Sequence, residues 1–251
     1  MAKEENSLRL DGRKEDEYRK PIEVKVGISK SAEGSAWAKI GNTEVIAGVK
    51  MKTGEPFPDT PDNGVLITTA ELLPMSSPAF QPGPPSQKAI EISRIIDRGI
   101  RESKMIDLKK LCVRKGELVW TIFLDMYTMN DDGNLIDTAA LAALAALKSA
   151  VLPKLDGDKV VFGEFTKTPL PLKALTVTTT IAKVGSDLIV DPTTDEEELL
   201  TSRLSVATSE KGAVHALQMG GSQGMTREEI KKAMEIGKKA SKELRKALKW
   251  S

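Results

Sequence analysis

Residues 132–147 of the chain are DGNLIDTAALAALAAL, a short polar turn followed by an almost uninterrupted apolar run. The Asp, Gly and Asn at its start favour a turn, and the run of Ala and Leu that follows favours a helix. The part from 138 to 147 is apolar on every side, which predicts a helix buried on all its faces. It is too short to span a bilayer. We therefore expect a central helix over Thr138–Ala150, capped by Asp137, with other elements packed around it.

The residues before this stretch predict strands joined by turns and loops. Alternating apolar residues over 21–29 indicate a half-buried strand, and Gly41-Asn42 is typical of a tight hairpin turn. Clusters of proline predict loops over 52–64 and 74–85. The residues that follow predict a helix over 86–103. The strands expected in this part are Pro21–Ser29, Ser35–Ile40, Glu44–Lys50, Val65–Leu73 and Leu118–Met129.

The residues after the central helix repeat the order of strands followed by a helix. Pro153 and Asp156-Gly157 interrupt the chain first. Thr226 and Glu229 have the spacing of a capping box, which predicts the start of a last helix that ends at about Lys249. The expected strands are Val160–Phe165, Ala174–Val184, Leu188–Val190, Leu204–Thr208 and Val214–Met219. Two runs of strands, each followed by helix, indicate an α+β protein built from two β-α halves that pack as layers.

The composition of the chain excludes some kinds of site but does not by itself suggest a function. The 37 basic and 36 acidic residues give a net charge of +1, so any contact with nucleic acid must come from a local cluster. Cys112 is the only cysteine and His215 the only histidine, which excludes an intrachain disulfide and a Cys/His zinc site. We expect His215 to be structural or exposed. The polar start, Met1–Asn6, and the cysteine usage favour a cytoplasmic protein in a reducing compartment.

Short motifs occur in consistent order along nearly the whole chain. They are Arg9-Leu10-Asp11-Gly12-Arg13, the helical segment Glu91–Arg101, Asp132–Asp137, Asp191-Pro192, Arg203–Val206 and Thr226–Ile230. Together they resemble the RNase PH family, and the C-terminal ones resemble the non-catalytic ring subunits of archaeal-type exosomes. The resemblance implies an RNase PH-like fold, also described as ribosomal protein S5 domain 2-like. We expect residues 1–251 to form one such domain, with halves of about 1–155 and 156–251.

The motifs depart from the family at the positions that carry its chemistry. The resemblance implies that active members hold phosphate with the Thr and Arg of a D-G-G-T-R-T motif at a helix start, where the helix dipole favours anions. Leu135 and Ile136 occupy those positions here, and neither can donate a hydrogen bond. Asp137 adds a negative charge that we expect to repel phosphate. Arg203 stands where the later residue of an acidic pair is expected, and the earlier acid corresponds to Glu197 or to a neighbouring residue of Asp195–Glu198. We therefore predict no catalytic residue, no metal and no cofactor.

The helix over 86–103 carries arginines at helical spacing. Arg94, Arg98 and Arg101 fall on one stripe, and the isoleucines at 92, 96 and 100 lie opposite and should face the core. Spacing alone favours a solvated face, because acidic residues at 91, 97 and 102 could pair with these arginines. In the family this helix lines the groove at the subunit boundary, so the resemblance implies that Arg94, Arg98 and Arg101 bind RNA.

The resemblance implies a function in an assembly. The chain is expected to alternate with a catalytic RNase PH-like subunit in a hexameric ring of three heterodimers, to bind single-stranded RNA and to structure the active site of its partner. The complex would be a 3′-to-5′ phosphorolytic exoribonuclease that carries RNA-binding cap subunits, with no membrane contact. Two alternatives stay open: an active phosphorolytic exoribonuclease, and an RNA-binding module of another assembly.

The last predicted helix is rich in lysine and allows more than one interpretation. It could touch RNA or lipid, but the favoured interpretation is a surface helix whose basic end suits the negative end of its dipole. The Gly220-Gly221-Ser222-Gln223-Gly224 segment before it lacks the spacing and the lysine of a phosphate-binding loop, so we interpret it as a plain entry to the helix.

Overall fold

Two β-sheets enclose two helices in this protein, and a computed structural model describes the arrangement for residue 9 and residues 11–248. The first sheet has the order β1-β2-β3-β6-β4, with β5 paired to β6. Its pairs are antiparallel except β4 with β6, which is parallel. Its strands are β1 (Ile22–Val26), β2 (Gly34–Ile40), β3 (Thr43–Gly54), β4 (Val65–Glu71), β5 (Cys112–Arg114) and β6 (Leu118–Asn130).

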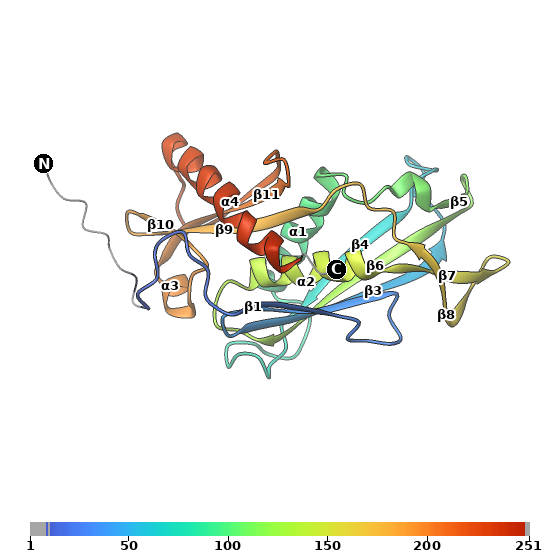
Figure 1. The fold of residues 1–251 in the computed structure, drawn as a ribbon, viewed down its shortest axis with the longest axis horizontal. Helices are drawn as coiled ribbons and strands as arrows, with labels where there is room; N and C mark the ends of the chain where they lie inside the picture. Colours follow the sequence, from blue (N-terminus) through green and yellow to red (C-terminus); the bar gives the residue numbers. More distant parts are fainter. Residues whose placement is uncertain (1–8, 10, 249–251) are drawn as a thin grey trace, which may run out of the picture.

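The second sheet comes from the C-terminal part of the chain and is antiparallel throughout. Its order is β10-β9-β11-β12. Its strands are β9 (Thr176–Val184), β10 (Asp187–Val190), β11 (Leu200–Ser209) and β12 (Val214–Gly221). The expected break near Asp156-Gly157 is the turn of a separate hairpin, β7 (Val151–Asp156) with β8 (Lys159–Pro169), which projects at one end of the molecule (Figure 1). The α+β class predicted from the sequence is confirmed.

The helices occupy two different layers. Helices α1 (Gln87–Glu102) and α2 (Leu135–Ser149) lie between the two sheets, and α4 (Arg227–Ala247) covers the outer face of the second sheet (Figure 1). A short α3 (Thr194–Glu198) and a 3-10 helix, η1 (Leu108–Leu111), complete the order. The predicted end of the last helix, at about Lys249, lies outside the described residues.

The position of α2 explains its sequence. It packs on the first sheet with one side and on β9 of the second sheet with the other, so every residue from Asp137 to Leu147 is buried. Each fully buried leucine contributes about 2 kcal/mol through the area it removes from water. The alanines between the leucines let both sheets approach the helix closely. The prediction of a helix buried on all sides is therefore confirmed.

The start of α2 differs from the prediction. The helix begins at Leu135 with Asn134 as its N-cap residue, in the left-handed conformation, and Asp137 lies inside the first turn. Asp137 does not cap the helix because its side chain points into the core, where it accepts a hydrogen bond from Tyr18. Gly133 before the cap has φ +89°, and a Cβ there would lie 2.4 Å from the carbonyl oxygen of Pro192. Only glycine allows the turn to approach the second half so closely.

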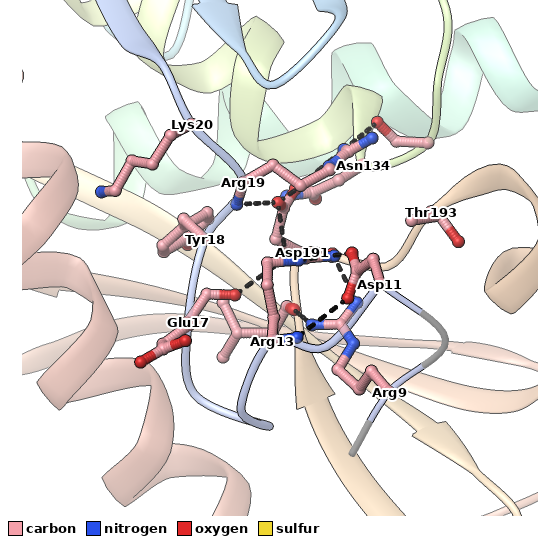
Figure 2. A network of polar contacts seen from close by, with 12 residues as sticks. Arg9, Asp11, Arg13, Glu17, Tyr18, Arg19, Lys20, Asn134, Asp191 and Thr193 are labelled. Carbon is pink, nitrogen blue, oxygen red and sulfur yellow. Dashed lines mark hydrogen bonds and ion pairs between the residues drawn. The ribbon is translucent and has the colours of Figure 1, made fainter.

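A buried ionic network holds that approach in place. The Asp191 carboxylate is fully buried and accepts hydrogen bonds from the backbone N–H and the guanidinium of Arg19 at 2.7–2.9 Å. It also accepts one from Arg13 at 3.1 Å and one from the Asn134 amide at 2.8 Å. Figure 2 shows Asp191 at the centre of these side chains. One carboxylate of the second half thus fixes both the N-terminal segment and the start of α2.

Removal of this carboxylate should destabilise the whole fold. In an Asp191→Ala variant the Arg19 side chain, only 9% exposed, would lose its buried charge partner. Breaking a buried ion pair costs about 3–5 kcal/mol, and we expect a loss of that size in the free energy of unfolding measured in urea. A matched control is Glu198→Ala, which removes an exposed carboxylate and should change the free energy by less than about 0.5 kcal/mol. Equal losses in both variants would contradict the role of Asp191.

Candidate functional site

A small hollow marks the place where the family resemblance puts the phosphate. It has a volume of about 150 Å³ and lies where α1, the start of α2 and β11 meet. Leu135 is buried in the core and Ile136 packs against it, so both present only aliphatic carbon to the hollow. The hollow is therefore lined by carbon at the two positions that the resemblance gives to a hydroxyl and a guanidinium.

The chain supplies its own anion at this helix start. The backbone N–H of Asn134 donates to Glu197 Oε1 at 2.8 Å, and Glu197 reaches this point from α3. Lys88 Nζ lies 3.6 Å from Glu197 Oε2 and 3.4 Å from Asp131 Oδ2. A helix N-terminus attracts an anion, and here a carboxylate of the same chain already meets that demand. The nearby lysine is neutralised by two carboxylates.

The other cation of the hollow is neutralised as well. Arg203, on β11, forms a salt bridge with Glu91 of α1. Gly220 of β12 leaves room for the pair, because a Cβ there would lie 2.9 Å from Glu91 Oε1 and 3.0 Å from Arg203. Arg203 thus stands at the position predicted from the sequence, and its charge is engaged within the chain. Among the described residues that line the hollow, no positive charge is left free to hold phosphate.

Asp137 is not the charge that faces the hollow. Its carboxylate is fully buried and accepts from the Tyr18 hydroxyl, with 2.8 Å between Oη and Oδ2. Burial raises the pKa of Asp137 to about 7, and the hydrogen bond from Tyr18 works against that rise. Burial and the neighbouring Asp137 also raise the pKa of Tyr18 well above its usual value. The expected repulsion of phosphate by Asp137 is therefore wrong, and Glu197 places its negative charge at the helix start instead.

A second hollow, beside the first, has a different charge. It has a volume of about 260 Å³ and lies along α1, where Arg94 and Arg98 line it together with Gln218 of β12. Both arginines are exposed, and Arg98 Nη1 donates to Gln218 Oε1 at 3.2 Å. Within residues 11–248, no ion pair engages Arg94 or Arg98, because Glu91 is turned toward Arg203. The isoleucines at 92, 96 and 100 are buried as predicted, together with Ile95.

Arg101 has a different environment from the other two arginines. Its Nε donates to Asp97 Oδ2 at 2.7 Å, and its Nη2 donates to the carbonyl oxygen of Leu66. Of the ion pairs that helical spacing allows between these arginines and their acidic neighbours, the structure contains the one between Arg101 and Asp97. The structure places Arg101 at the far end of α1, away from the hollow that Arg94 and Arg98 share.

Some residues of the site gave no signal in the sequence. Gln218 of β12 lies far along the chain from Lys88 of α1, and only the packing of α1 against β12 places Gln218 beside that helix. Across the described residues, no group of His, Cys, Asp and Glu is arranged to hold a metal ion. No helix in that part of the chain is long and apolar enough to cross a membrane.

These features define the class of the protein. Two sheets enclose α1 and α2, and the second half docks on the start of α2. Residues 18–153 match the model of the 3′ exoribonuclease family, domain 1, and residues 174–240 match that of domain 2. The chain belongs to this family, RNase PH.

Two relatives of known name and two solved structures are similar over almost the whole chain. The Methanothermobacter thermautotrophicus protein "Exosome complex component Rrp42" is 46% identical, over 92% of this chain and 86% of its own. The Thermococcus gammatolerans protein of the same name is 46% identical, over 96% and 89%. The Archaeoglobus fulgidus exosome with RNA bound to the active site contains a chain with TM-score 0.88 and 40% identity, over 97% and 93%. A chain of an archaeal exosome core has TM-score 0.83 and 38% identity, over 96% and 91%.

The buried Asp137 should make stability depend on pH. The pKa of Asp137 is about 7 in the folded chain, and the ordinary value of 3.8 applies to the unfolded chain. Between these two pH values the folded state therefore keeps a proton that the unfolded state has released. The contribution of this proton to the free energy of unfolding is fully present below pH 3.8 and is lost as the pH rises through about 7. The free energy of unfolding of the wild type, minus that of Asp137→Asn, should fall by about 1.4 kcal/mol per pH unit in this window. Urea denaturation from pH 4 to 8 measures it, and a flat difference would show that Asp137 stays ionised.

Proposed function

We propose that this chain is a non-catalytic ring subunit of an archaeal-type exosome. The observation that carries the proposal is the contrast between the two neighbouring hollows. In the hollow at the start of α2, each cation is paired with a carboxylate and the helix N-terminus is met by Glu197. In the hollow along α1, two exposed arginines have no acidic partner among the described residues. The first arrangement opposes phosphorolysis, and the second supports binding of a phosphate backbone.

The proposed RNA contacts are Arg94 and Arg98, with Arg101 as a further contact. Arg94 and Arg98 are four residues apart, so their Cα atoms are separated by a rise of about 6 Å on one helix face. Both can turn toward a strand that runs along α1, because neither is held by an ion pair among residues 11–248. Arg101 would have to share or release Asp97 to take part.

The proposed partners follow from the relatives. Both named relatives are exosome components, and the similar solved chains belong to archaeal exosomes, one with RNA in the active site. We propose that this chain alternates with a catalytic RNase PH-like subunit in a ring of three heterodimers with RNA-binding caps, and that it acts in the cytoplasm. Its own share would be to complete the RNA groove of the partner. The whole chain, 1–251, would act there as one domain, since the Asp191 network joins its two parts.

The alternative of an active phosphorolytic enzyme predicts turnover by the chain itself. We expect the purified chain to release no nucleoside diphosphate from RNA in the presence of phosphate, and to build no RNA from nucleoside diphosphates. The physical reason is that no residue in the described part of the chain offers a free cation or hydroxyl at the start of α2. Thin-layer separation of labelled products measures both reactions, with the reconstituted ring as the positive control. Turnover that persists after removal of any catalytic partner would overturn the proposal.

The arginines give a test in the assembled complex. An Arg94→Glu/Arg98→Glu variant should slow RNA decay by the reconstituted ring while assembly stays intact, because it replaces attraction for phosphates with repulsion. The corresponding Ala pair should have a smaller effect, and both effects should depend on salt because backbone contacts release counterions.

A matched control keeps the change in charge and moves it elsewhere. Lys159→Glu/Lys167→Glu alters two exposed lysines of β8, on the hairpin that projects at the end of the molecule. This control should leave decay unchanged. Native mass measurements report assembly, and melting temperatures report stability. If the α1 pair changes melting alone and decay is unchanged at low and moderate salt, the two arginines are only a solvated face.

A further inference from the structure

A third hollow lies on α4, away from the site already described. It has a volume of about 390 Å³ and is formed by the last turns of α4 and by the turn between β11 and β12. Its cations are Lys211, Lys238, Lys242, Arg245 and Lys246, and Glu210 is the only acidic residue among the described residues that line it. Lys238, Lys242 and Lys246 are four residues apart in turn, so they form a row along one face of the helix. We call these three residues with Lys211 the α4 lysine row.

The α4 lysine row forms no ion pair among residues 11–248, whereas three other charges of this helix do. Lys239 pairs with Asp16, and two glutamates of α4 pair with lysines elsewhere in the chain. Within residues 11–248, no carboxylate forms an ion pair with any member of the row, and all four lysines are exposed. Arg245 is partly buried and donates to the carbonyl oxygens of Leu175 and Thr208, which are neutral partners. The positive charge of the hollow is therefore only opposed by Glu210.

The helix itself does not explain the row. The dipole favours cations in the last turn, which accounts for Arg245 and Lys246 but not for Lys238, Lys242 or Lys211. Like charges four residues apart weaken a helix by a few tenths of a kcal/mol per pair. The row thus lowers the stability of the isolated chain slightly, and an anion from outside would reverse that effect.

The lining of the hollow identifies the kind of anion. Beside the charged residues it contains only Ser209, Gly212 and Ser241, with no apolar side chain. The core of a protein interface is apolar and poor in lysine, whereas nucleic-acid interfaces are polar and strongly positive. A row of flexible ammonium groups can contact the phosphates of a phosphodiester backbone, and such contacts do not depend on the base sequence. We propose that the α4 lysine row binds the backbone of single-stranded RNA.

This second RNA contact lies on the opposite side of the second sheet from Arg94 and Arg98. Helix α1 packs on the inner face of that sheet, next to β9 and β12, and α4 covers its outer face (Figure 1). The identity of the ligand rests on the proposed RNA-binding function, but the two contacts share no residue. A strand bound along α4 would therefore be held outside the groove along α1, and each contact can be removed alone.

Direct binding tests the proposal. The full-length chain is titrated with a 5′-labelled oligoadenylate by fluorescence anisotropy over a range of salt concentrations. Each phosphate contact to a single strand contributes about 0.7 to the slope of log affinity against log salt. Lys238→Glu/Lys242→Glu should weaken binding, and Lys238→Gln/Lys242→Gln should lower the slope by about 1.4 without added repulsion. The matched control is Lys231→Glu/Lys232→Glu, two exposed lysines of the same helix outside the hollow.

The outcomes separate the two proposals. The Lys238→Gln/Lys242→Gln change should lower the slope of log affinity against log salt equally in the wild type and in the Arg94→Glu/Arg98→Glu background. This result, with binding by the control variant unchanged, supports RNA binding by the α4 lysine row. Equal effects of the row variant and its control would overturn it, and so would a row variant that loses binding of polyglutamate but keeps binding of RNA, since the site would then suit an acidic protein. If the α1 variant leaves decay by the ring unchanged while the row variant still loses RNA, the proposed RNA contact at Arg94 and Arg98 fails and the α4 site stands.

Discussion

The buried carboxylate of Asp191 is the constraint on which the rest of the structure depends. It lies just after β10 and holds Arg13, Arg19 and Asn134, which belong to the N-terminal segment and to the cap of α2. A fully buried charge is tolerated only when paired and hydrogen-bonded, and here every contact comes from the other half of the chain. The network therefore sets how the second sheet sits on α2, and with it the shape of the groove at the start of that helix.

The docking of the second sheet also determines the environment of helix α2. Because a sheet lies on each side, its alanines and leucines are buried all round, and the only buried charge in it, Asp137, meets Tyr18. The start of the helix faces the groove and would attract an anion. The same docking brings α3 beside it, so that Glu197 meets the Asn134 N–H and takes the position that a bound phosphate would need.

Charge pairing distinguishes the two hollows on either side of Glu91. Its carboxylate turns to Arg203, which neutralises the groove at α2 and leaves Arg94 and Arg98 without an ion pair in the described part of the chain. A single side chain thus contributes to both properties on which the proposed function rests. The choice of partner for Glu91 depends on β11 and β12 lying against α1, with Gly220 making room for the pair.

Four features could be predicted from the sequence: the α+β class, the buried helix after the D-G-N turn, the inward isoleucines of α1 and the aliphatic residues at the phosphate position. Each of these follows from local periodicity or from the chemistry of a single side chain. Three features come from the folding of distant segments onto each other. Asn134 rather than Asp137 caps α2, Glu197 meets the helix start, and Arg101 has an ion pair while Arg94 and Arg98 have none among the described residues. On a helix, several carboxylates lie at a spacing that would let them form an ion pair with a given arginine, and the sequence does not distinguish between them. Only the packing of distant strands settles which carboxylate is turned toward another partner, and a local pattern holds no information about that contact.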